Sequence, residues 1–184
     1  YFSFIEAMFH LSKTEMKIED ITFILESENE AEKNSTGFKR LEKDFMTHTD
    51  AVKKFNVEYD VDKHPLIFFA THVPHSGYYA GHTYRFRITI DKEYPFRSPK
   101  VHSQYKIFHP NISQETGSVC INILRLDWSP VYDINSVLEA ILNVLIEPNF
   151  QEPLFQDAAD LYEKDKLEYE KKIKLINATC YANF

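Results

Sequence analysis

The fold is decided by residues 55–90, FNVEYDVDKHPLIFFATHVPHSGYYAGHTYRFRITI. Apolar and polar residues alternate over 55–61, a second apolar run covers 66–73, and the alternation returns over 84–90. A period of two is typical of a half-buried β-strand. The turns between the runs are short, whereas parallel strands need long crossovers. The stretch therefore predicts an antiparallel meander.

Helical patterns lie on both sides of the meander. Ser35 and Thr36 offer the chemistry of a helix start, and Phe38, Leu41 and Phe45 then share one helical face. After the meander, 134–148 carries an apolar stripe of helical period, and 157–176 reads as one or two further helices. Residues 100–130 between them are mostly irregular, which is typical of functional segments. This order predicts an α+β domain.

The N-terminal part differs from the rest of the chain. We divide the sequence into an extension over 1–35 and a core domain over 36–184. The apolar opening YFSFIEAMFHL, residues 1–11, is a candidate docking peptide, or else folds back on the domain. The acidic stretch ESENEAEK, residues 26–33, indicates a solvated, flexible linker.

Composition excludes several classes of protein. The chain has 184 residues, 43% of them hydrophobic, which is enough for a packed core. Its net charge of −7 argues against a nucleic-acid partner, and it has no apolar run long enough for a membrane-spanning helix. Cys120 and Cys180 are too few for a disulfide framework, and the scattered histidines predict no metal site. Such cysteine usage suits the cytosol or the nucleus.

The chemistry is expected in residues 108–135, FHPNISQETGSVCINILRLDWSPVYDIN. Cys120 follows a turn containing Gly117, and a thiol in a loop can act as a nucleophile. A cysteine hydrolase would need a histidine base, for which His102 and His109 are available. A buried structural cysteine is the simpler alternative. The residues alone leave these alternatives open.

Several motifs together resemble those of the ubiquitin-conjugating enzyme family. They occur in the family's order over about residues 38–178: Tyr94-Pro95-Phe96, Pro99-Lys100-Val101, His109-Pro110-Asn111, the cysteine, Trp128-Ser129-Pro130 and Glu147-Pro148-Asn149. Residues 119–128, VCINILRLDW, are closest to the neddylation branch, since ubiquitin-type members more often have Asp where Asn122 stands. The resemblance implies the family's fold, with an N-terminal helix, a four-stranded antiparallel meander, an active-site loop and C-terminal helices.

The resemblance also implies an activity. Cys120 would accept a ubiquitin-like modifier from its activating enzyme as a thioester and pass it to a lysine, usually with a RING-type ligase. A Nedd/Rub modifier is favoured, and a ubiquitin-specific enzyme is the alternative. A non-catalytic scaffold is less favoured because Cys120 and Asn111 are both present. No cofactor is expected, because ATP is used by the activating enzyme.

Roles for the other site residues follow from the same resemblance. Asn111 would donate to the oxyanion or hold the active-site loop. Glu152 would orient the lysine, although the family usually has Asp there. His109 and Pro110 would be structural, and Trp128 would pack under the active-site loop. The stretch from Asn111 to Cys120 is one residue longer than usual, which puts the position of the loop in question.

The resemblance implies two partner surfaces, one for the activating enzyme and one for the ligase. The activating enzyme would contact the first helix and the docking peptide, through Arg40, Lys43, Phe9 and Leu11. A solvated helix face is the alternative for the two basic residues. The ligase would contact two loops that contain Pro95, Phe96, Ser129, Pro130 and Val131. Core packing is the alternative for Phe96.

Overall fold

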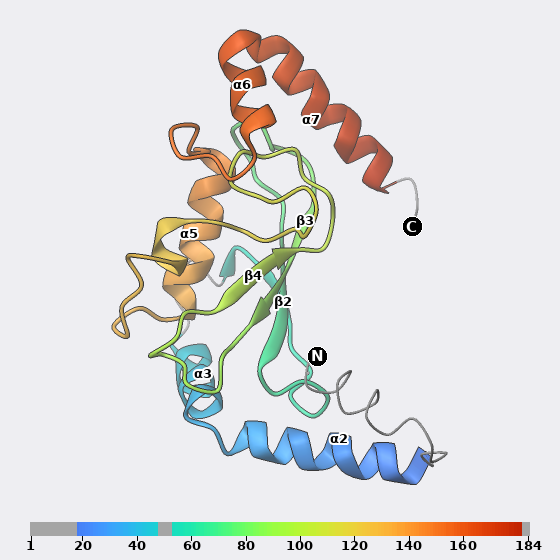
Figure 1. Ribbon diagram of the computed structural model, residues 1–184, viewed down its shortest axis with the longest axis vertical. Helices are drawn as coiled ribbons and strands as arrows, with labels where there is room; N and C mark the ends of the chain where they lie inside the picture. The colour runs from blue at the N-terminus through green and yellow to red at the C-terminus, as the bar shows by residue number, and fades with distance from the viewer. Residues whose placement is uncertain (1–17, 48–52, 182–184) are drawn as a thin grey trace.

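A computed structural model describes residues 18–47 and 53–181, with side chains for 25–47 and 53–179 (Figure 1). The predicted α+β class is confirmed by the order of its elements: α2 (Ile18–Lys33), α3 (Thr36–Met46), β1 (Asn56–Glu58), β2 (Ile67–His72), β3 (Tyr84–Thr89), β4 (Lys100–Ser103), the 3₁₀ helix η1 (Asn122–Leu124), α5 (Ile134–Ile146), α6 (Gln156–Lys164) and α7 (Lys166–Tyr181). None of the helices described in these ranges has both the length and the apolar character needed to cross a bilayer.

The four strands form one antiparallel sheet in the order β1-β2-β3-β4, so the predicted meander is confirmed. β1 is shorter than the alternation over 55–61 suggests. The chain leaves the sheet after Glu58, and the Asp60 carboxylate accepts a hydrogen bond from the Lys63 N–H in the turn that follows. β4 lies in the segment expected to be mostly irregular. Its four residues span only two periods of alternation, too few to identify a strand from the sequence.

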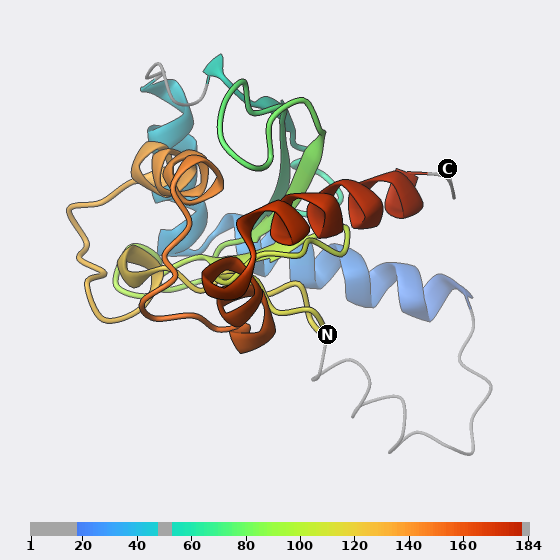
Figure 2. The same ribbon diagram turned by 90° about the horizontal axis from the view of Figure 1, so that it is seen from above.

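The core lies between the sheet and two helices. Alternate residues of β2 and β3 are buried, as a half-buried strand requires. α3 and α5 lie next to one another on one side of the sheet (Figures 1 and 2). Figure 1 also shows α2 at one end of the molecule and α6 and α7 at the other. Full burial of a large aliphatic or aromatic side chain contributes about 1.5–3 kcal/mol, and the fully buried ones include Phe68, Phe86, Ile88, Leu138 and Ile141.

The acidic stretch 26–33 is helical, which corrects the expectation of a flexible linker. Residues 18–33 contain neither Gly nor Pro, and Glu, Ala and Lys favour a helix. The C-terminal end of α2 is attached to the turn after β1: Lys33 Nζ lies 2.9 Å from Asp62 Oδ1, and Asn29 Nδ2 donates to the Asp62 carbonyl at 3.0 Å. The candidate docking peptide, with Phe9 and Leu11, lies outside the described residues.

Arg40, expected either to contact the activating enzyme or to lie on a solvated helix face, is hydrogen-bonded within the fold. Its Nε donates to Asp44 Oδ1 at 2.7 Å, and its two terminal nitrogens donate to the carbonyls of Pro130 and Tyr132 at 3.2 and 2.9 Å. Asp44 is buried and also accepts hydrogen bonds from the Tyr94 hydroxyl and the Ile134 N–H. This cluster fastens α3 to the loop before α5. Lys43, by contrast, is exposed.

His109 fixes the loop that leads to the candidate nucleophile. The ring is fully buried, Nε2 donates to the Val144 carbonyl of α5 at 2.9 Å, and Nδ1 accepts from the Asn111 N–H at 2.9 Å. Tyr79 stacks on the ring with centroids 4.8 Å apart. Burial lowers the pKa of His109 to about 4, against a smaller opposing effect of the Val144 carbonyl. The imidazole is therefore neutral and structural at pH 7.

The first prediction concerns Asp44. Asp44→Ala leaves the part-buried Arg40 without its carboxylate, which costs about 3–5 kcal/mol when a buried pair loses one partner. Asp62→Ala is the matched control, because that carboxylate is 85% exposed and such pairs contribute at most about 1 kcal/mol. Urea denaturation of both variants measures the difference. Equal free energies of unfolding for the two would contradict the structural role of the Asp44 cluster.

The second prediction concerns pH. Between the unfolded pKa of 6.5 and the folded pKa of about 4, the unfolded chain binds a proton at His109 and the folded chain does not. Stability therefore falls as the pH drops through this window, by about 3 kcal/mol in total. Nitrogen shifts of the ring should still report a neutral imidazole at pH 5.5. A protonated ring in the folded protein at that pH would overturn this assignment.

Candidate active site

Cys120 follows a tight turn against β4. Gly117 has a φ of +71°, and a Cβ there would lie 2.6 Å from the Ser103 carbonyl oxygen, so the position requires glycine. The Gly117 carbonyl accepts from the Ser103 N–H at 2.7 Å. The Cys120 N–H then donates to the Asn111 carbonyl at 2.9 Å. The turn thus brings the two residues predicted to carry the chemistry together.

The additional length of the loop between Asn111 and Cys120 is accommodated in this turn. The Gly117 N–H donates to the Ser113 carbonyl at 2.9 Å, and the Ser113 N–H donates to the Ser118 carbonyl at 3.0 Å. The flanking residues Ile112 and Val119 form an antiparallel bridge. The SQETGS segment, residues 113–118, therefore closes on itself, and the contact between Asn111 and Cys120 is kept.

The Asn111 side chain holds the neighbouring loop. Its Nδ2 donates to the Asn149 carbonyl at 2.9 Å, and its Oδ1 accepts from the Asn149 N–H at 2.9 Å. Only 2% of the residue is exposed. Of the two roles left open by the sequence, this geometry is that of a loop-holding residue, with one Nδ2 hydrogen remaining.

Pro110 and Asn149 extend this bracing to the loop that carries Glu152. The Pro110 carbonyl accepts from the N–H groups of Leu154 and Phe155 at 2.7 and 2.8 Å. The Asn149 side chain accepts from the Glu152 N–H at 3.2 Å. The His-Pro-Asn segment therefore fixes the backbone on both sides of the candidate acid.

Two hollows meet at Cys120. The first has a volume of about 350 Å³ and is lined by Asn111, Asn149 and two exposed carboxylates, Glu147 and Glu152. Its negative charge suits an approaching cationic side chain. The second, of about 560 Å³, is lined by more basic and hydroxyl groups, including Lys100, His102 and Ser118. Cys120 is accessible from both sides.

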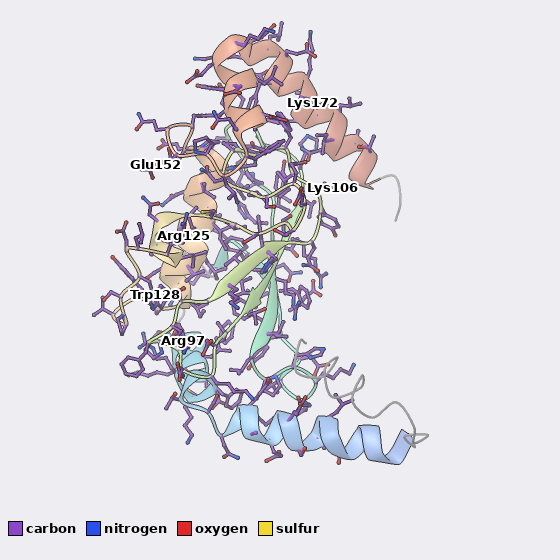
Figure 3. The ribbon with its side chains drawn as sticks, in the orientation of Figure 1. Arg97, Lys106, Arg125, Trp128, Glu152 and Lys172 are labelled. Carbon is purple, nitrogen blue, oxygen red and sulfur yellow. The ribbon has the colours of Figure 1, made fainter. Side chains whose placement is uncertain are left out.

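Arg125 is a site residue that the sequence reasoning missed. Its Nη1 donates to Cys120 Sγ at 2.9 Å, and it lines both hollows. Figure 3 shows Arg125 and Glu152 along the same side of the molecule. The signal in the sequence is a basic residue five positions after the cysteine, which comes close only because η1 turns the chain back.

No histidine among the described residues forms a hydrogen bond with Sγ. His109 has both ring nitrogens occupied. His102 lines the second hollow, and burial, with help from Arg87 and Lys100, lowers its pKa. The arrangement thus lacks the thiol–histidine pair of a cysteine hydrolase. Within the described residues, no group of three His, Cys, Asp or Glu side chains could hold a metal ion.

Trp128 packs among aromatic side chains and bonds to the turn at residues 94–97. It lies between Tyr94 and Tyr132, each with ring centroids 5.9 Å away, and its Nε1 donates to the Pro95 carbonyl at 2.7 Å. The indole N–H therefore has its hydrogen-bond partner in the 94–97 turn. Trp128 therefore joins the two loops expected to bind a ligase.

The tips of these two loops face outward. Phe96 is 75% exposed and Val131 is 80% exposed. Core packing, the alternative for Phe96, is excluded by this exposure. Pro130 is exposed as well, whereas Pro95 and Ser129 are half-buried. The loops offer apolar side chains on a fixed backbone, which suits a binding surface.

Comparison with known proteins identifies the family to which this chain is similar. A family profile described as "Ubiquitin-conjugating enzyme" matches residues 40–177. The NEDD8-conjugating enzyme UBC12 of Kluyveromyces lactis is 42% identical over 113 residues, 61% of this chain and 61% of the relative. The NEDD8-conjugating enzyme ubc12 of Schizosaccharomyces pombe is 40% identical over 116 residues, 60% of this chain and 65% of the relative. The aligned part thus spans less than two thirds of these relatives.

The fold comparison agrees. The solved structure of S. cerevisiae Ubc12 superposes with a TM-score of 0.69 and 34% identity, covering 82% of this chain and 84% of that one. The profile match runs from Arg40 to Asn177 and includes the Asn111 loop, Cys120 and both hollows. The chain belongs to the ubiquitin-conjugating enzyme family.

Proposed function

We propose that this protein accepts a ubiquitin-like modifier of the Nedd/Rub type as a thioester on Cys120 and transfers it to a substrate lysine. The observation that carries the proposal is an accessible thiol between two hollows, hydrogen-bonded to a guanidinium and braced by the His-Pro-Asn loop. Similarity to proteins named NEDD8-conjugating enzymes supports the choice of modifier.

The chemistry needs little from the protein in the first step. The Cys120 thiolate attacks the thioester carbonyl on the activating enzyme, and the sulfur of that enzyme leaves as a thiolate, so one thioester replaces another of similar energy. The second step is harder, because a lysine amine must attack the carbonyl and form a tetrahedral oxyanion. The acidic hollow with Glu147 and Glu152 lies where a cationic lysine would approach.

The choice between a Nedd/Rub modifier and ubiquitin rests on one residue that lines the first hollow. The uncharged Asn122, the first residue of η1, lines this hollow. Ubiquitin-type members of the family more often carry Asp at this position. A ubiquitin-specific enzyme is the second candidate, and parallel charging with the two modifiers decides between them.

The partners follow from the same proposal. An activating enzyme loads Cys120 and uses ATP itself, so this chain needs no cofactor. The exposed Lys43 of α3 is offered to that enzyme, and the Phe96 and Val131 tips are offered to a RING-type ligase. We place the reaction in the cytosol or nucleus, where a free catalytic thiol stays reduced.

The third prediction tests the nucleophile. Incubation with ATP, a Nedd/Rub-type modifier and its activating enzyme should give an adduct that thiol reductant removes. Cys120→Ser should give an oxygen ester that resists reductant, and Cys120→Ala should give none. Cys180→Ala is the control and should load normally. Gels run with and without reductant measure this, and a reductant-sensitive adduct on Cys120→Ala would refute the assignment.

The fourth prediction tests Asn111. Asn111→Ala removes two hydrogen bonds to Asn149 and should lower the free energy of unfolding by about 1–2 kcal/mol. Because the loop beside Cys120 then loses its support, loading and lysine discharge should both slow by similar factors. Asn111→Asp keeps the acceptor and should fall between. A loss confined to discharge, with unchanged loading and stability, would instead indicate that Asn111 acts on the oxyanion.

A further inference from the structure

Among the described residues, no carboxylate forms an ion pair or a hydrogen bond with the Arg125 guanidinium, which lies beside the Cys120 sulfur. Its Nη1 is 2.9 Å from Sγ, and in the described part of the chain this is the only hydrogen bond that its side chain forms. Two other arginines behave differently: the exposed Arg97 forms an ion pair with Glu93, and the half-buried Arg85 forms two hydrogen bonds with Glu58. A free guanidinium beside a nucleophile needs an explanation.

The backbone places this side chain without relying on its own contacts. The Arg125 N–H donates to the Asn122 carbonyl at 2.9 Å, which closes η1. Leu124, one residue earlier, is buried, and its carbonyl accepts from Ser98 Oγ at 2.8 Å. The chain leading into Arg125 is therefore fixed, and the Arg125 Cα is held within reach of Cys120.

The Asn111 amide is oriented by the loop that it holds, so only its one remaining Nδ2 hydrogen could serve as a donor at the same carbon. Both polar ends of its amide are bonded to the backbone of Asn149, and the residue is almost fully buried. A donor must lie close to where the oxygen develops charge, without first breaking other bonds. Of the donors beside Sγ, Arg125 already points at the reacting atoms.

We propose that Arg125 is a catalytic residue that donates to the thioester carbonyl oxygen as it becomes an oxyanion. The carbonyl oxygen and Sγ are bonded to the same carbon, so a guanidinium that reaches one can reach the other. Its fork of five N–H donors can serve both atoms at once. This inference rests on the proposed thioester chemistry and adds to it a group for stabilising charge.

The proposed step balances. The lysine amine attacks the carbonyl carbon, and the C=O electron pair moves to oxygen. The C–Sγ bond then breaks as the double bond re-forms, the nitrogen gives one proton to water, and Cys120 leaves as a thiolate. Arg125 remains protonated throughout and donates first to the oxyanion and then to the leaving sulfur.

The test uses the full chain, loaded with modifier and freed of ATP and activating enzyme, with no ligase present. Free lysine is added over a range of concentrations, and loss of the thioester is followed in single turnovers on non-reducing gels. The variants are Arg125→Gln, Arg125→Lys and Arg125→Ala. Arg97→Gln is the matched control, because it removes an exposed arginine that lines neither hollow at Cys120.

Arg125→Gln should lower the limiting rate by about tenfold to a hundredfold, which is at or below the lower end of the effect of losing one oxyanion donor, since the site is open. The lysine concentration at half-maximal rate should not change. Arg125→Lys should fall between, added guanidinium ion should restore part of the Arg125→Ala rate, and Arg97→Gln should match the wild type. Melting temperatures should be equal throughout.

A wild-type limiting rate in Arg125→Gln, or a raised half-saturating lysine concentration with an unchanged limiting rate, would overturn the inference. The proposed function fails separately, if the wild type charges with no modifier. Arg125 is then tested on Cys120 acylated by a small synthetic thioester, because aminolysis of that ester needs the same donor. An unchanged rate in Arg125→Gln would overturn the inference there too.

Discussion

The place of the nucleophile depends on the hydrogen bonds that residues 109–111 make with chain more than thirty positions later. His109 reaches α5 at Val144, Pro110 reaches Leu154 and Phe155, and Asn111 reaches Asn149. Cys120 is then bonded through its N–H to the Asn111 carbonyl. Since α5 packs on the sheet, the thiol is fixed relative to the core by buried polar groups, which are costly to leave unpaired.

A second buried cluster does the same for the partner surfaces. Asp44 and Arg40 join α3 to the carbonyls of Pro130 and Tyr132, and Tyr94 joins the cluster from the 94–97 turn. Trp128 then bonds to Pro95 from the other loop. The backbone of the two loops with exposed tips is therefore fixed by buried hydrogen bonds. Binding of a partner there would cost little conformational entropy, because the loops are already ordered.

The sequence predicts a helix or strand well where its hydrophobic pattern extends over enough residues, and poorly where the pattern is too short. β2, β3 and α5 follow from repeated alternation or a continuous stripe, whereas β4 has only four residues. The acidic stretch of α2 predicts a linker because acidic residues favour both solvated chain and helix, and the residue that fastens the end of the helix to the turn is the distant Asp62. Arg40 looked like a surface charge, since a pattern cannot show that its guanidinium turns toward the Pro130 loop.

The residues of the site also differ in how they can be identified, some from sequence motifs and others only from the fold. The motifs identify Cys120 and the His-Pro-Asn loop, but only the fold shows that Asn111 is committed to Asn149 while Arg125 lies on the sulfur. Buried polar groups do the positioning, so changing them should alter stability and every step together. The exposed groups, Arg125, Glu147 and Glu152, carry charge into an open site where water screens them. Under the proposed function, a bound modifier or acceptor covers this site and excludes that water, so changing these groups should alter the rate of transfer while the fold stays intact.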